Sequence, residues 1–236
     1  MKQNPWNRRE LLRTLRAAGA GLAIAPLALG APEEEDVAPA EDLMREHGVL
    51  NRVLLIYEEA IRRLGARQEF APRVLSEAAG IVRRFVEEYH EKSEEASLFP
   101  RFEKAGKLVD LVAVLRQQHQ AGRRVTAEIE RLAARLTFAE TRRADRDRLS
   151  DAMRLFIRMY RPHEAREDTV LFPAFRSLVS KKEYEDLGNA FEEKEQRLFG
   201  KEGFEKVVTQ VAGLEKELGI YELSGFTPRL PSGGGR

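Results

Sequence analysis

The sequence predicts an all-α protein, an up-down-up-down four-helix bundle with an internal two-fold repeat and additional C-terminal helices. Four long segments carry apolar residues at helical spacing, and the connections between them are short, so consecutive helices should be antiparallel neighbours. The third and fourth segments repeat the residue pattern of the first and second. A composition of 33% charged and 42% hydrophobic residues in a chain of 236 is typical of a folded, helix-rich protein.

Residues 1–30 resemble a twin-arginine-type signal peptide. Arg8 and Arg9 are followed by two leucines and then by an Ala- and Gly-rich apolar stretch over 17–30. This stretch is shorter than the roughly 20 apolar residues that a membrane-spanning helix needs, so stable membrane insertion is not expected. Cleavage before Ala31 fits the small-x-small rule, and residues 38–40 offer a second such site. The resemblance implies a periplasmic or otherwise exported protein.

The elements of the predicted bundle follow in order. Residues 31–40 form an acidic linker without periodicity. Helices are then expected over about 41–64, 72–97 and 108–136, with a fourth that begins near Thr141. Together they make a bundle domain of residues 41–176.

The rest of the chain is predicted to cover this bundle. Residues 177–224 form a C-terminal helical extension, with helices over about 181–199 and 204–218, and residues 225–236 form a flexible tail. Within the bundle, Pro162 should bend the fourth helix. The repeated Leu-Phe-Pro sequences should end two helices, at Pro100 and Pro173.

All the histidines of the chain belong to the repeat. Each half supplies one lone histidine and one His-x-x-x-Glu pair, at nearly the same spacing. On a helix, residues four apart lie on the same face, so each pair can address one metal or two adjacent metals. The candidate ligands are His47, His90 and Glu94 in the first half and His119, His163 and Glu167 in the second.

A metal site explains this pattern better than a structural role does. A single histidine on an apolar stripe is usually a hydrogen-bonded core residue, but here every histidine follows one duplicated scheme. Burying two carboxylates without a cation would also be costly. The chain has no cysteine, so the ligands must be nitrogen and oxygen. Zinc prefers a closed tetrahedron, whereas two carboxylates shared among four histidines suit two octahedral ions, which favours iron over other divalent metals.

These motifs resemble the hemerythrin-like, or HHE cation-binding, domain over about residues 41–176. The resemblance implies a non-haem diiron centre with bridging carboxylates and terminal histidines, which binds dioxygen, nitric oxide or peroxide. In invertebrate hemerythrins the second carboxylate lies five residues after its histidine, which here is Asp168. Asp168 is therefore an alternative to Glu167, although the internal repeat favours Glu167.

One departure from the respiratory members of this family bears on function. They carry an extra histidine four residues after the one that matches His119, and this chain has Arg123 there. An arginine does not ligate, so it should turn outward or pair with an acid such as Glu95 or Asp168. The remaining set is two histidines for each metal, which leaves more open positions for small ligands.

Three functions are compatible with such a site. The first is an exported protein that binds dioxygen or nitric oxide, the second a diiron peroxidase or nitric-oxide-consuming enzyme, and the third iron storage or a structural metal domain. No redox partner is indicated, and the basic excess lies in residues 1–30, so the mildly acidic remainder gives no electrostatic case for nucleic acid. Near the motifs, Phe99 and Phe172 should wall the site, while Tyr89 and Tyr160 are either core residues or hydrogen-bond donors.

Overall fold

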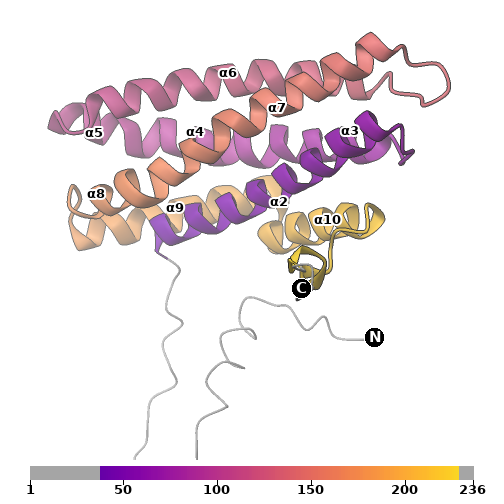
Figure 1. Cartoon of the computed structure of the whole chain (residues 1–236). Helices are drawn as coiled ribbons and strands as arrows, with labels where there is room; N and C mark the ends of the chain where they lie inside the picture. The colour runs from indigo at the N-terminus through magenta and orange to yellow at the C-terminus, as the bar shows by residue number, and fades with distance from the viewer. Residues whose placement is uncertain (1–37, 229–236) are drawn as a thin grey trace, which may run out of the picture.

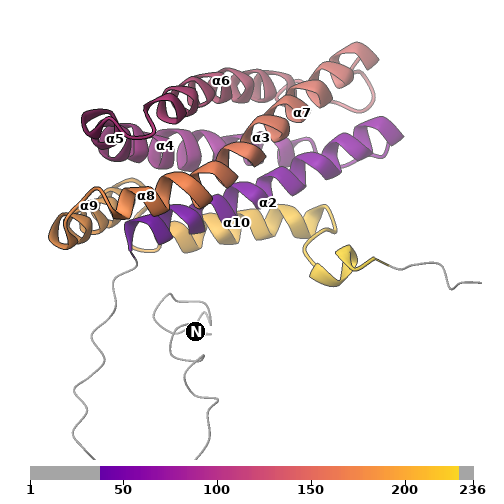
Figure 2. The same cartoon turned by 60° about the vertical axis from the view of Figure 1, so that its left-hand side comes forward.

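The computed structural model describes residues 38–228, and within that range the regular structure is helical, with no strand. The twin-arginine-type segment of residues 1–30, and most of the predicted acidic linker, lie outside the described residues. Four long helical rods run side by side and alternate in direction (Figures 1 and 2). The predicted all-α bundle is confirmed. No helix in the described range is long and apolar enough to cross a lipid bilayer.

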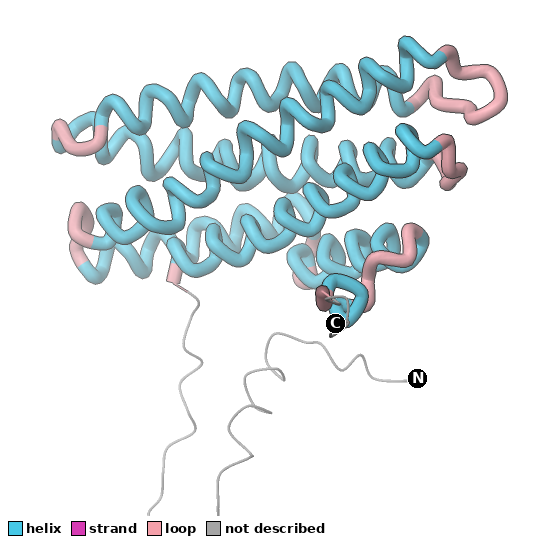
Figure 3. The backbone as a smooth tube through the Cα atoms, viewed as in Figure 1, coloured by secondary structure: helices cyan, strands magenta, loops and turns pink. Residues whose placement is uncertain are grey.

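The four rods form a closed ring in which each packs against the next. The first rod is α2 (Pro39–Ala66), and the third is α6 (Val109–Ala133). The second rod is continuous through α3 (Arg73–Ile81), η1 (Val82–His90), α4 (Glu91–Ser93), η2 (Glu94–Leu98) and α5 (Phe99–Ala105). The fourth is continuous through α7 (Arg143–Arg166), η3 (Glu167–Leu171) and α8 (Phe172–Arg176). Short loops join them at alternating ends of the bundle (Figure 3).

The first rod begins earlier than the sequence pattern indicated. Pro39 stands in the first turn, where its missing N–H removes no helical hydrogen bond, and Glu41 and Asp42 are placed where acids favour a helix N-terminus. The rod ends at Arg67, which adopts a left-handed conformation with φ of 55°. The last three residues of the predicted linker, 38–40, therefore lead directly into the bundle.

The expectation that Pro100 and Pro173 end their helices is wrong. Each lies in the first turn of a further α-helical segment, α5 and α8, and each of those segments follows a π-helical one, η2 and η3. Where π-helical hydrogen bonding changes back to α-helical, a residue without an N–H costs least. Both rods therefore continue past their proline. Pro162 lies inside α7, and that helix runs on to Arg166.

The core consists of two apolar clusters with a polar layer between them. One cluster holds residues such as Leu50, Phe85 and Phe156, and the other holds residues such as Leu43 and Leu115. Along each rod, the buried histidine lies where one cluster gives way to the other. The buried polar side chains in this layer include His47, His90, Glu94, His119, His163 and Glu167.

The C-terminal extension completes the same core. α9 (Lys181–Phe199) and α10 (Gly203–Glu217) pack against the first and second rods. Phe191 of α9 joins one apolar cluster, and Val211 of α10 joins the other. A short 3₁₀ helix, Leu223–Phe226, follows and is exposed, so the first residues of the predicted tail have regular structure.

Gly122 of α6 lies directly against the Tyr160 side chain of the fourth rod. A Cβ atom at this position would lie 2.0 Å from the phenolic oxygen of Tyr160. Tyr160 is buried and belongs to the core. Its ring has little room to withdraw, so any side chain at residue 122 would displace it.

We expect Gly122→Ala to lower the free energy of unfolding by about 1–3 kcal/mol, because it overpacks the contact with Tyr160. Gly48→Ala is the matched control, since Gly48 lies within α2 and a Cβ there meets nothing within 4 Å. The control should be neutral or stabilising by up to about 1 kcal/mol from helix propensity. Chemical denaturation followed by circular dichroism compares the two. Equal stabilities would contradict the packing described here.

Candidate metal centre

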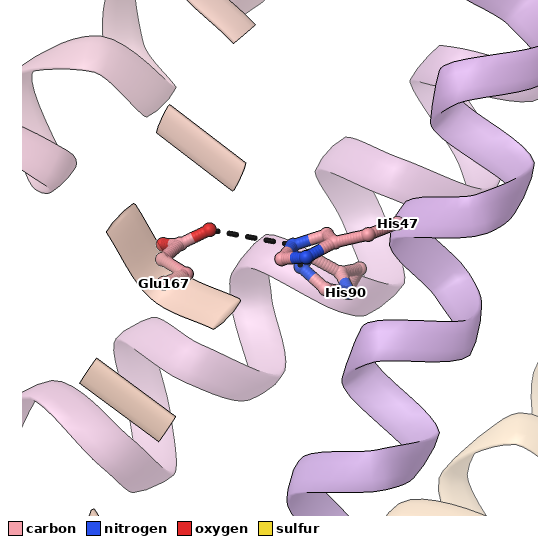
Figure 4. Close-up of side chains that lie close together, drawn as sticks. All are labelled: His47, His90 and Glu167. Atoms are coloured by element: carbon pink, nitrogen blue, oxygen red, sulfur yellow. Dashed lines mark hydrogen bonds and ion pairs between the residues drawn. The ribbon is translucent and has the colours of Figure 1, made fainter. Parts of the chain in front are cut away.

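The structure brings the predicted ligands together in one buried layer, which we call the histidine layer: His47, His90, Glu94, His119, His163 and Glu167. Each rod contributes one histidine, and all six side chains are buried. The histidines form two pairs. The rings of His47 and His90 have centroids 4.7 Å apart, and those of His119 and His163 have centroids 5.0 Å apart. In the first pair the two Nε2 atoms are 3.1 Å apart (Figure 4).

The two carboxylates lie between the pairs. Oε2 of Glu167 is 3.3 Å from Nε2 of His47 and 3.2 Å from Nε2 of His163, and the first of these contacts is drawn in Figure 4. Oε2 of Glu94 is 3.7 Å from Nε2 of His90 and 3.5 Å from Nε2 of His119. Each carboxylate therefore contacts one histidine of each pair and lies between the two pairs.

Several polar atoms of the layer have no hydrogen bond. Within the described part of the chain, this holds for both carboxylate oxygens of Glu94, both of Glu167, and Nε2 of His119. A buried carboxylate without hydrogen bonds is costly unless a cation compensates its charge. The donor set therefore fits cations held between the two histidine pairs.

The opposite nitrogen of every histidine is held by a residue outside the layer. Nδ1 of His47 lies 2.7 Å from Asp168, and Nδ1 of His90 lies 2.7 Å from Glu46. Nδ1 of His119 lies 3.1 Å from Glu95, and Nδ1 of His163 lies 2.8 Å from the amide oxygen of Gln118. We call these four acceptors the outer partners: Glu46, Glu95, Gln118 and Asp168.

The outer partners determine which nitrogen can ligate. An ionised carboxylate or an amide oxygen accepts hydrogen bonds, so we assign the proton of each neutral imidazole to Nδ1. The lone pair is then on Nε2, which faces the other members of the layer. This is the arrangement found where histidines bind metals, because the outer acceptor fixes the ring and increases the basicity of the ligating nitrogen.

The pKa values of the histidines and carboxylates in the layer are shifted by burial and by one another. Burial acts to lower the pKa of His47, but the hydrogen bond to Asp168 and the nearby carboxylate of Glu167 outweigh it and raise this pKa to about 10. Burial and the nearby His47 lower the pKa of His90. Burial and the neighbouring Glu167 raise the pKa of Glu94, whereas Glu167 has a pKa below its usual range because His163 and His47 outweigh its burial.

The structure separates the roles of the adjacent residues Glu167 and Asp168. Glu167 lies between the two histidine pairs, as the internal repeat indicated. Asp168 binds the outer nitrogen of His47, and its side chain is 35% exposed. In the first half, Glu95 takes the corresponding place, one residue after Glu94 and on the outer nitrogen of His119.

Arg123 pairs with two acids at the edge of the layer. Its guanidinium contacts Glu95 at 2.7 Å, a pairing that the sequence had suggested, and also Glu91 at 2.7 Å. The Tyr160 hydroxyl donates to the same Glu91 at 2.7 Å. Burial raises the pKa of Glu91 to about 8, although Tyr160 and Arg123 act to lower it. Arg123 is thus held beside the second histidine pair by two acids.

Aromatic rings close one side of the layer symmetrically. Phe99 stacks on His119 with ring centroids 5.4 Å apart, and Phe172 stacks on His47 with centroids 5.5 Å apart. Both rings therefore wall the site, as expected. Tyr160 lies against His163 with centroids 5.5 Å apart, whereas the Tyr89 hydroxyl donates to the backbone oxygen of Phe191 at 3.4 Å. Of the two tyrosines, Tyr160 is the one that borders the layer.

Sequence reasoning assigned none of the outer partners to a histidine, and it did not name two of them at all. Glu46 and Gln118 each come directly before a lone histidine, in corresponding places of the two halves. Each binds the histidine of the other motif in its half, His90 or His163. The internal repeat contained this signal, because both polar residues recur at one offset in otherwise apolar helix faces.

Fold and site together define a helical protein with a duplicated histidine and carboxylate centre. The family described as the hemerythrin HHE cation-binding domain matches residues 38–173, more than half of the chain. The chain belongs to this family, and it is a metal-binding helical protein.

The curated relatives share nearly the whole chain. One protein of Mycobacterium tuberculosis and one of Mycobacterium bovis are each 47% identical over 243 residues, which covers 97% of this chain and 94% of theirs. Both are described as uncharacterized. No solved structure matches the chain significantly.

The contrast between Glu167 and Asp168 can be tested directly. Glu167→Gln removes an anionic oxygen that contacts one histidine of each pair, so the chain should lose most of its bound metal after dialysis. Asp168→Asn keeps an acceptor on the outer nitrogen of His47, so it should retain full stoichiometry with affinity weakened by about 10–100-fold at most. Metal per chain is measured by plasma mass spectrometry. A larger loss in Asp168→Asn than in Glu167→Gln would make Asp168 the bridging residue.

Proposed function

We propose that the histidine layer holds two iron ions, and that the protein binds dioxygen or another small oxidant such as nitric oxide at this non-haem diiron centre. The observation that carries the proposal is the placement of Glu94 and Glu167, each between two histidines of different pairs and without hydrogen bonds to its oxygens in the described residues. One carboxylate in such a position would provide ligands for a single cation. Two carboxylates together with four imidazoles provide enough ligands for two cations.

The ligand chemistry supports iron over zinc. Six protein ligands shared by two ions leave coordination positions that the protein does not fill, which suits octahedral ions better than closed tetrahedral zinc. The chain has no cysteine, so ions that require thiolates are disfavoured. Manganese and other divalent ions accept the same donors, so metal analysis must accompany each functional measurement.

The surrounding residues prepare the layer for a small ligand. Ferrous ions bound there would supply both an open coordination position and electrons to an oxidant. The outer partners hold the four imidazoles with Nε2 inward. Phe99 and Phe172 exclude water from one side of the layer. The Tyr160 hydroxyl is engaged by Glu91, so it orients the wall beside His163.

A second candidate is an enzyme that consumes peroxide or nitric oxide. Arg123 stands where respiratory hemerythrins carry an additional histidine, and its guanidinium is paired with Glu91 and Glu95. This leaves two histidines for each ion and more room for exchangeable ligands. Reversible binding and turnover are distinguished by one set of measurements.

Anaerobic ferrous protein exposed to air should develop a visible absorption band that disappears when oxygen is removed, if the protein is a carrier. Steady consumption of added peroxide, with no stable band, would support the enzyme instead. His90→Ala and His163→Ala, one from each half, should abolish the signal and lower bound iron. Glu87→Gln is the matched control, because this buried carboxylate pairs with Arg83 and should leave iron content unchanged. Full iron stoichiometry in both histidine variants would refute the proposal.

We also propose that the protein is exported by the twin-arginine route, on the basis of Arg8, Arg9 and the apolar stretch of residues 17–30. Arg8→Lys combined with Arg9→Lys should retain the protein in the cytoplasm, while Arg13→Lys, which keeps the paired arginines, should not. Cell fractionation measures the distribution, and mass spectrometry of the exported chain should show a start at Ala31. Equal export of both variants would exclude this route.

A further inference from the structure

The outer partners follow the same two-fold repeat as the ligands. The residue directly before each lone histidine, Glu46 or Gln118, binds the outer nitrogen of His90 or His163. The residue directly after each bridging carboxylate, Glu95 or Asp168, binds the outer nitrogen of His119 or His47. Corresponding histidines of the two halves are thus hydrogen-bonded by residues at corresponding positions in the sequence.

One position breaks this symmetry. His90 has a carboxyl group, Glu46, on its outer nitrogen, whereas His163 has the neutral amide of Gln118 at a similar distance, 2.7 Å against 2.8 Å. A carboxylate donates more electron density through an imidazole than an amide does, so it makes the ligating nitrogen more basic. The distance to the outer nitrogen is therefore nearly the same in the two halves, but the acceptor is a carboxyl group in the first half and a neutral amide in the second.

Neighbouring charges increase the difference. Glu95 is compensated by Arg123 at 2.7 Å and by Lys92 at 2.6 Å. Asp168 pairs with His47, and no lysine or arginine in the described residues forms an ion pair with it.

The surroundings of Glu46 are also rich in acids. Carboxylate oxygens of Asp42 and Glu195 lie within 4.8 Å of one another and of Glu46. Lys194 acts on Glu46 electrostatically, but its Nζ donates to Ser93 Oγ at 2.8 Å and to the backbone oxygen of Tyr89 at 3.0 Å. The outer side of the first pair, His47 and His90, therefore carries a cluster of acids that forms no ion pair with a lysine or arginine at Glu46 or Asp168 in the described residues.

We infer that the two cation positions are unequal, and that the position at His47 and His90 binds a divalent cation more tightly than the position at His119 and His163. Much of the difference in affinity arises because the second half has the neutral Gln118 where the first half has Glu46. This inference rests on the two-cation site proposed above. A cation held mainly by the first pair is surrounded by the carboxylates of Asp168 and Glu46. A cation held by the second pair is surrounded by an amide and a compensated carboxylate.

Titration of the metal-free full chain with Co²⁺ tests the inference. Calorimetry and the visible spectrum of bound Co²⁺ should resolve two steps, with the first at least about tenfold tighter than the second. Gln118→Glu should tighten the second step by about tenfold and bring the two steps together. Glu46→Gln should weaken the first step by about 10–100-fold.

Matched controls distinguish the effect of the contact with His163 from the effect of added charge and from a loss of folding. Gln117→Glu adds the same charge one residue away on an exposed position, and it should leave both steps unchanged. Glu87→Gln removes a buried carboxylate that pairs with Arg83 and should also leave them unchanged. Circular dichroism shows whether each variant is folded. If Glu46→Gln is unfolded, Gln118→Glu still tests the inference, because Gln118 is only partly buried.

The outcomes distinguish this inference from the proposed function. Two cations that bind with equal affinity, or a second step that Gln118→Glu does not tighten, overturn the inequality and leave the two-cation site intact. A chain that takes up no cation, or only one, overturns both. Equal effects of Gln117→Glu and Gln118→Glu would show that charge in general, and not the contact with His163, controls the affinity.

Discussion

Two carboxylates that are fully buried beside four imidazoles are the constraint on which the rest of the structure depends. Glu94 and Glu167 have no exposed surface, and their oxygens make no hydrogen bonds within the described residues. Removing such charges from water costs several kcal/mol for each ion unless positive charge compensates it. The bundle buries them in the histidine layer, which divides the apolar core into two clusters and supplies the imidazoles that accompany them.

The internal repeat explains how one chain meets this constraint twice. A π-helical segment begins at each bridging carboxylate, η2 at Glu94 and η3 at Glu167. π-Helical hydrogen bonds link residues five apart, so the residue five positions later lies near the same face of the rod. Those residues are Phe99 and Phe172, which stack on His119 and His47. The altered helix thus carries both the bridging acid and the aromatic wall.

The amino-acid pattern predicted the layer better than the details around it. Histidines and glutamates four apart are visible in a linear sequence because the α-helical period places them on one face. The π-helical segments are not visible in this way, so Pro100 and Pro173 were expected to end helices that in fact continue. The outer contacts of Glu46 and Gln118 reach across to another rod, and their partners become apparent only when the rods are packed.

Both departures from symmetry fall on α6 and on the same histidine pair. Gln118 replaces a carboxyl group on the outer nitrogen of His163, and Arg123 compensates the carboxylate on the outer nitrogen of His119. Each change reduces the electron density that reaches the second pair, while the first pair keeps Asp168 and Glu46. In the proposed two-cation site, a cation held firmly by the first pair would also fix Glu94 and Glu167 for the second. The second position would then exchange ligands within a site that stays assembled.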